Sequence, residues 1–193
     1  MPPSRPTWFP KPYADAVQRL RVPLGFVLVF AFAWLAAPSL ISLAIGLPVA
    51  LLGLALRAWA AGCLYKNQRL ATGGPYALMR NPLYLGTLTV AAGLVLATRR
   101  WELALLFGAA FFLIYFPTIE QEEQHLRKLF PADFPGYAER VPLLWPRWGT
   151  GFNGEPFRWS QYQRNQEYNA AVGFVLGSVI LVSKLIQATS SPP

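Results

Sequence analysis

The chain contains 193 residues, of which 54% are hydrophobic and only 13% are charged. Soluble domains carry about 25% charged residues, so this composition argues against a water-soluble globule. The net charge of +8 at pH 7 lies in the gaps between apolar runs rather than on one stripe, which disfavours nucleic acid and fits a protein that faces anionic lipid headgroups. With one cysteine and one histidine, we expect no disulfide framework and no metal.

Long apolar runs indicate several membrane crossings. Residues 22–63 contain a single charge, Arg57, and as helix they measure about 60 Å, enough to cross a ~30 Å hydrocarbon core twice. We predict an all-α, polytopic membrane protein whose residues 1–193 form one domain. Pro38 and Ser39 should join the first two spans as a tight hairpin, and Ser160 with Gln163 should cap the start of the last. The five predicted spans are 22–37, 40–62, 82–97, 103–117 and 170–186.

The distribution of Lys and Arg predicts an orientation. Thirteen of them lie in the N-terminal tail and in the polar segments 65–81 and 118–167, against two, Arg99 and Arg100, on the opposite side. The positive-inside rule therefore places the N-terminus and both polar segments in the cytoplasm, and we expect a multi-pass protein of a bacterial cytoplasmic membrane. Arg57 would then lie near the cytoplasmic end of its span. Snorkelling to the headgroups is the favoured interpretation there, with a functional role as the alternative.

A first polar cluster precedes the third span. Pro82 suits the first turn of a helix, where its missing N–H is not needed. Arg80 and Asn81 are thereby placed at a helix N-terminus, beside free backbone donors that bind carboxylates and other anions. The alternative is a plain helix start with one positive-inside arginine.

A second cluster follows the fourth span. Residues 119–130 have helical periodicity, and Glu122 and Glu123 flank the apolar stripe of that helix. Carboxylates beside a buried stripe need a cation, a proton or a polar ligand as partner. A pair between Glu123 and Arg127 is the alternative, but it leaves Glu122 unexplained.

One short glycine motif does not support a nucleotide-binding site. Residues 149–154 match G-x-G-x-x-G by letter, but no strand precedes them and no helix follows at once. We interpret them as a flexible loop. A soluble dinucleotide-binding enzyme is not supported.

Taken together, the motifs resemble a known family. The order GPYALMRNPLYLG (74–86), an apolar span pair, EEQHL (122–126), then Tyr137 and Arg140-Val141-Pro142 is similar to the isoprenylcysteine carboxyl methyltransferase and phospholipid methyltransferase superfamily. Such a resemblance implies a small integral-membrane enzyme that uses S-adenosylmethionine. It also implies cofactor binding on the cytoplasmic side, beneath a cap segment, and a lipophilic acceptor that arrives from the bilayer.

The resemblance also implies site residues. Asn81 replaces a more usual histidine, and an amide cannot shuttle a proton near pH 7. The acceptor stays open between a prenylcysteine-like carboxylate, a lipid amine and another lipophile. The implied catalytic residues are Arg80, Glu122, Glu123 and Arg140, with Arg140 pairing an acidic substrate group. The implied cofactor-binding residues are Gly74, Pro75, Tyr76, Arg80, Asn81, Pro82, Tyr84, Gly86, Glu122 and Glu123.

Two other functions compete with methyl transfer. A membrane reductase of the sterol-reductase type has a similar Arg-x-Pro-x-Tyr-x-Gly helix start and uses NADPH. Adjacent anions at Glu122 and Glu123 would oppose a cofactor that carries several phosphates. A non-enzymatic lipid-binding membrane protein would predict no cofactor pocket and no effect of neutralising the two glutamates.

Overall fold

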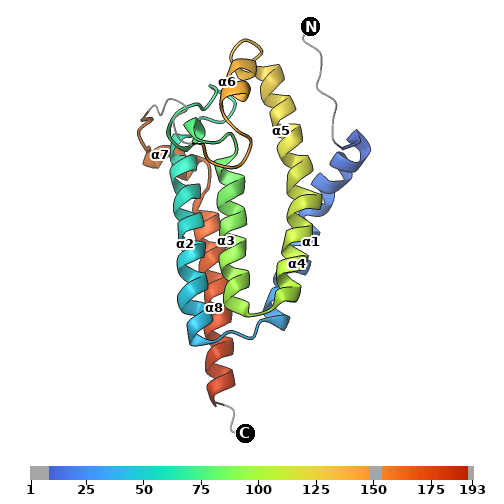
Figure 1. Ribbon diagram of the computed structural model, residues 1–193, viewed down its shortest axis with the longest axis vertical. Helices are drawn as coiled ribbons and strands as arrows, with labels where there is room; N and C mark the ends of the chain where they lie inside the picture. The colour runs from blue at the N-terminus through green and yellow to red at the C-terminus, as the bar shows by residue number, and fades with distance from the viewer. Residues whose placement is uncertain (1–8, 148–153, 191–193) are drawn as a thin grey trace.

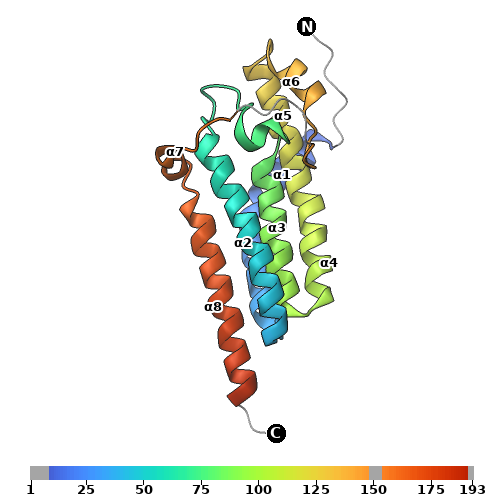
Figure 2. The same ribbon diagram turned by 60° about the vertical axis from the view of Figure 1, so that its left-hand side comes forward.

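The computed structural model describes residues 9–147 and 154–190, and all regular structure in those ranges is helical. Long helices run side by side, and the short helices α6 (Phe134–Arg140) and α7 (Trp159–Arg164) lie at one end, opposite the C-terminus (Figures 1 and 2). The predicted all-α membrane class is confirmed. The long elements are α1 (Lys11–Leu35), α2 (Leu40–Cys63), α3 (Pro82–Thr98), α4 (Trp101–Ala110), α5 (Phe116–Leu129) and α8 (Tyr168–Ser190); the short ones are the 3₁₀ helix η1 (Gly74–Ala77), the π-helical η2 (Phe111–Tyr115), α6 (Phe134–Arg140) and α7 (Trp159–Arg164).

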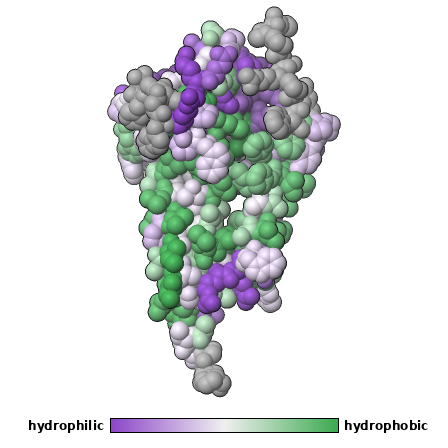
Figure 3. Space-filling model, viewed as in Figure 1, coloured by the Kyte–Doolittle hydropathy of each residue, from purple (hydrophilic) through white to green (hydrophobic). Residues whose placement is uncertain are grey.

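Three helices in the described part of the chain are long and apolar enough to cross a membrane: Leu40–Cys63, Trp101–Leu129 and Tyr168–Ser190. Two shorter apolar helices, Pro23–Leu35 and Pro82–Thr98, lie beside them. A band of hydrophobic side chains separates hydrophilic patches at the upper and lower parts of the molecule (Figure 3). The count of five crossings and the cytoplasmic N-terminus stay predictions.

Helices α2 and α3 form the closest pair because glycines face each other along their contact. A Cβ built on Gly46 would lie 2.4 Å from the carbonyl oxygen of Gly93, and one on Gly53 would lie 2.7 Å from that of Gly86. These separations are too short for any side chain. Small residues let backbones approach closely where the apolar surroundings give no hydrophobic drive for association.

The predicted turn at Pro38 and Ser39 is present, since α1 ends at Leu35 and α2 begins at Leu40, but the two helices do not pack against each other as a tight hairpin. Ser39 caps α2 in a reciprocal capping box with Ser42. Helix α1, however, packs against α4, η2 and α5, while the glycine face of α2 is taken by α3. Tyr13 Oη donates to the Leu113 carbonyl at 2.8 Å, and these extra contacts extend α1 to Lys11, well before the predicted start at residue 22.

Two further boundaries differ from the predictions. The fourth span and the glutamate-bearing helix are one rod, Trp101–Leu129, in which η2 continues the helix from α4 to α5. Ser160 does not cap the last span: it lies inside the separate helix α7, which has Arg158 at its N-cap and no side-chain cap bond. Gln166, with φ of 54°, turns the backbone between the end of α7 and the start of α8. Residues 148–153, which include most of the glycine motif, lie outside the described ranges.

Candidate active site

A cavity of about 1320 Å³ lies at the end of the molecule that carries the short helices. Helices α1, α3 and α5, η1 and the residues between α7 and α8 all contribute to its wall. Both sequence clusters meet there. The predicted site residues that line it are Tyr76, Arg80, Asn81, Pro82, Tyr84, Glu122 and Glu123.

Arg80 and Glu123 form an ion pair that connects the start of α3 to α5. Arg80 Nε lies 2.7 Å from Glu123 Oε1, and Arg80 also donates from its other side-chain nitrogens to Glu123 Oε2 and to the Ala138 carbonyl. Both side chains are largely buried. Glu123, which the sequence alternatively paired with Arg127, thus binds Arg80. Arg80 is therefore held by a carboxylate of the chain itself.

Glu122 contacts a different partner. Its Oε2 accepts a hydrogen bond of 3.0 Å from Tyr84 Oη, and the carboxylate is exposed within the cavity wall. Tyr84 in turn packs edge-on against Tyr115, which η2 places on the same wall. π-helical turns often occur at functional sites.

Tyr76 brings a buried hydroxyl to the cavity. Its side chain is 6% exposed, and its Oη has no hydrogen-bond partner among the described residues. Burial raises the pKa of this phenol well above its ordinary value, and the charge of Glu122 raises it further. The backbone of Tyr76 is fixed from α6, because Tyr137 Oη donates to its carbonyl at 2.7 Å. An unpaired buried hydroxyl costs free energy unless a ligand pairs with it.

Other predicted residues have structural surroundings. Asn81 Nδ2 donates to the Leu143 carbonyl at 3.1 Å, which ties α3 to the chain after α6. Gly74 has φ of 58°, and Gly86 packs against α2, where an added Cβ would lie 2.5 Å from Arg57 Cγ. Gly74, Pro75 and Gly86 are not among the residues that line the cavity, and neither is Arg140, whose side chain is exposed at the end of α6.

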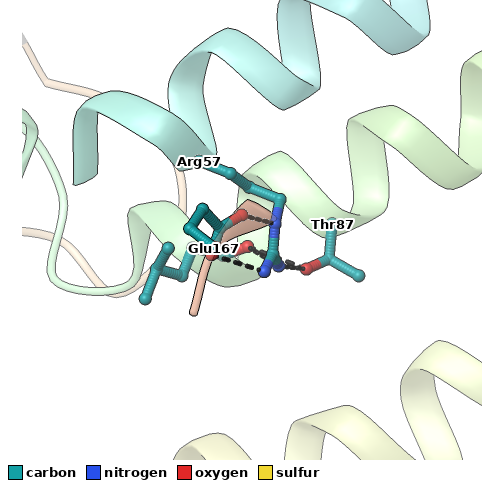
Figure 4. Close-up of polar contacts among 4 residues, drawn as sticks. Arg57, Thr87 and Glu167 are labelled. Atoms are coloured by element: carbon teal, nitrogen blue, oxygen red, sulfur yellow. Dashed lines mark hydrogen bonds and ion pairs between the residues drawn. The ribbon is translucent and has the colours of Figure 1, made fainter. Parts of the chain in front are cut away.

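An ion pair between Arg57 and Glu167 lies on the cavity wall and was not predicted from the sequence. Arg57 does not snorkel: its guanidinium binds Glu167 in a bidentate pair and also donates to Thr87 (Figure 4). Complementary charge was the feature of the sequence that could have indicated this pair, because Arg57 interrupts the second span and Glu167 directly precedes the last span. Their separation of 110 residues hid the contact.

Within residues 9–147 and 154–190, no group of three or more His, Cys, Asp or Glu side chains could hold a metal ion. Cys63, at the end of α2, is buried.

Comparison with known proteins assigns the family. Residues 21–133 match the phospholipid methyltransferase family. The chain is 36% identical over 138 residues to the cobalt-zinc-cadmium resistance protein CzcN of Cupriavidus metallidurans, covering 67% of this chain and 60% of that protein. It is also 36% identical over 118 residues to the nickel-cobalt-cadmium resistance protein NccN of Alcaligenes xylosoxydans xylosoxydans, covering 59% and 53%. The chain thus spans little more than half the length of these relatives.

No solved structure matches the chain. The family match covers α2, α3 and the rod that carries both glutamates, which are the elements that bring the two sequence clusters to one cavity. This all-helical membrane protein belongs to the phospholipid methyltransferase family.

Proposed function

We propose that the chain transfers a methyl group from S-adenosylmethionine to a lipophilic acceptor that reaches it from the membrane. The observation that carries this proposal is the single cavity in which the Gly74–Gly86 motif and the Glu122-Glu123 motif meet. Both motifs belong to the resemblance on which the proposal also rests.

The residues present fit this cofactor. S-adenosylmethionine carries an amino group and ribose hydroxyls, for which an accessible carboxylate at Glu122 is a suitable acceptor. The unpaired hydroxyl of Tyr76 offers a buried hydrogen-bonding group on the same wall. Since Arg80 is bound by Glu123 and Asn81 by the Leu143 carbonyl, we assign these two residues to building the wall rather than to direct charge neutralisation.

The acceptor chain would occupy the apolar part of the wall. Phe26 and Val29 of α1 and Leu83 of α3 line the cavity alongside its polar groups. When bound, S-adenosylmethionine would supply a sulfonium methyl for in-line displacement by the acceptor, with its demethylated thioether as the leaving group. The chain's own contribution is to hold donor and acceptor in line and to exclude water from the reacting atoms.

Ligand binding to the purified full-length chain tests the proposal. In calorimetry with detergent-solubilised protein, S-adenosylmethionine and its demethylated product should bind, and NADPH should not. Binding of NADPH without S-adenosylmethionine would favour the reductase. Binding of neither, together with retention of lipid, would favour a non-enzymatic lipid-binding protein.

A further inference from the structure

We propose that Glu167 is a specificity-determining residue. Its carboxylate binds the Arg57 guanidinium inside the cavity and so prevents the carboxylate of an amphiphile from binding to Arg57. For catalysis, this selectivity would mean that the methyl acceptor is a lipophile whose reacting end is not anionic, and that consequence rests on the proposed function. Its consequence for binding does not depend on the reaction.

The contacts of Arg57 leave little of its guanidinium for a ligand. Nε donates to Glu167 Oε1 at 2.6 Å, and Nη2 donates to Glu167 Oε2 at 2.9 Å. Nη1 donates to the Leu83 carbonyl at 3.3 Å and to Thr87 Oγ1. Because a guanidinium has five N–H donors, these four contacts use nearly all of them.

Burial makes the pair hard to exchange. The Glu167 side chain is 6% exposed and that of Arg57 is 22% exposed. An incoming carboxylate would have to displace Glu167 and leave that charge buried without a counterion, which is strongly unfavourable. Glu167 is thus an internal carboxylate in the position that an acidic ligand would take.

The backbone around Glu167 is fixed independently of the ion pair. Asn165 Nδ2 donates to the carbonyls of Ala61 and Leu64 at the end of α2, at 2.9 and 3.0 Å. Gln166 then turns the chain with a positive φ, which delivers Glu167 to the cavity wall at the start of α8. This segment lies outside residues 21–133, so the family match does not include the residue that neutralises Arg57.

The second largely buried arginine of the cavity is also neutralised from within. Arg80 pairs with Glu123, as described above, and its side chain is 13% exposed. Both buried guanidiniums on this wall thus have a carboxylate of the chain as counterion. A neutral or cationic amphiphile meets no charge penalty from them, whereas an anionic one finds no buried cation to bind.

Two probes of equal chain length test the proposal on the full chain in non-ionic detergent: dodecanoate and dodecanol, each titrated against protein-free micelles as blank. Glu167→Gln should improve dodecanoate binding relative to dodecanol by about 10-fold, since one charge-assisted hydrogen bond is gained. The double variant Arg57→Gln/Glu167→Gln should lose this gain.

Glu102→Gln is the matched control. It removes the same charge from an exposed residue in the first turn of α4, which does not line the cavity. The proposal is overturned if Glu102→Gln gives the same gain, if the gain persists in the double variant, or if Glu167→Gln gives none.

A second comparison covers the case in which Glu167→Gln does not fold. Wild type and Glu167→Asp, which keep the charge, should both bind dodecanoate more weakly than dodecanol, and equal binding would overturn the proposal. A chain that fails to bind S-adenosylmethionine but shows this selectivity would contradict the proposed function and leave the role of Glu167 intact.

Discussion

Glu122 and Glu123 are neighbours in the chain, yet their side chains contact different partners. Glu123 lies against Arg80 and helps to hold α3 and α5 together, while Glu122 accepts from Tyr84 on the cavity wall. Adjacent residues on a helix point about 100° apart, which is why the two carboxylates reach different side chains although both line the cavity. We therefore expect a binding role for Glu122 and a structural one for Glu123.

Replacing Glu122 tests this difference. Glu122→Gln keeps the shape and removes the charge, and a hydrogen bond to a charged group contributes about 1.5–3 kcal/mol. Because Glu122 is exposed, the lower figure applies, and S-adenosylmethionine binding should weaken about 10-fold in calorimetry. Glu120→Gln is the control, since Glu120 accepts from the Phe9 amide instead. Equal affinity in both variants would place the cofactor elsewhere.

Tyr76 predicts how stability depends on pH. Burial raises the pKa of this phenol above its ordinary value, so the folded chain keeps a proton that the unfolded chain loses near pH 10. Stability should consequently fall as the pH rises above about 10, by at most about 1.4 kcal/mol per pH unit for this group. Tyr76→Phe should flatten that slope in thermal unfolding measured between pH 8.5 and 11.5. An unchanged slope would mean that other groups dominate.

Single residues mark the limit of what the sequence could predict. Tyr84, Glu122 and Glu123 were identified because motif letters and helical periodicity are local properties, and the structure brings all three to one cavity. The prediction for Arg57 was wrong because a charge in an apolar run is unfavourable in the membrane, and snorkelling to the headgroups was the local way to avoid that free energy. Its counterion comes from a segment 110 residues away, and no local pattern encodes that pairing.

At the scale of elements, the glycine contact between α2 and α3 fixes the frame of the site. Gly86 lies one turn after Pro82 and brings the start of α3 against Arg57, while Gly93 continues the contact toward the other end. The arrangement of these two helices sets where Leu83 and Thr87 meet the guanidinium.

Adding one methyl group to this contact should destabilise the protein. A Cβ on Gly93 would lie 2.3 Å from the Ala50 amide nitrogen, so Gly93→Ala forces the helices apart and should cost about 1–3 kcal/mol of unfolding free energy. Gly108→Ala in α4 is the matched control, because nothing lies within 4 Å of its Cβ. That variant should be neutral or slightly more stable. Chemical unfolding in detergent compares the two, and equal stabilities would contradict close packing at Gly93.

Element boundaries were predictable where one physical signal dominates. Helix α2 begins directly after Ser39 and α3 begins at Pro82, as expected, because caps and N-terminal prolines act locally. Partners of helices were not predictable. A short connection suggested that α1 would pack on α2, but the backbone approach allowed by glycines made α3 the closer partner.

At the scale of the whole molecule, the charge asymmetry predicts which face of the membrane carries the cavity. Single cysteines introduced at Ser4, Ala132 and Ser191 in a Cys63→Ala background should report it. An impermeant thiol reagent should label Ser191→Cys from outside and the other two only after lysis. External labelling at Ser4 or Ala132 would reverse the orientation, and protection at Ser191 would change the number of crossings.

The names of the two relatives concern metal resistance, which makes metal dependence worth measuring. Transfer from a sulfonium is a direct displacement driven by positioning rather than by a Lewis acid. On the proposed function, methyl transfer by the purified chain should therefore be unchanged, within about twofold, after treatment with EDTA and desalting. Loss of activity that returns with added Zn²⁺, Co²⁺ or Ni²⁺ would show that a metal takes part.

The length of the rod Trp101–Leu129 has a kinetic consequence. Its 29 residues span about 43 Å, and Glu122 lies about 32 Å along it from Trp101, close to the ~30 Å thickness of the hydrocarbon layer. With Trp101 at the opposite surface of the bilayer, this length would place the carboxylate at the depth of the lipid headgroups, where the water-borne cofactor and the membrane-dissolved acceptor of the proposed function would meet. Turnover should then follow the mole fraction of acceptor in the surface rather than its bulk concentration, so inert detergent added at constant acceptor should slow the reaction.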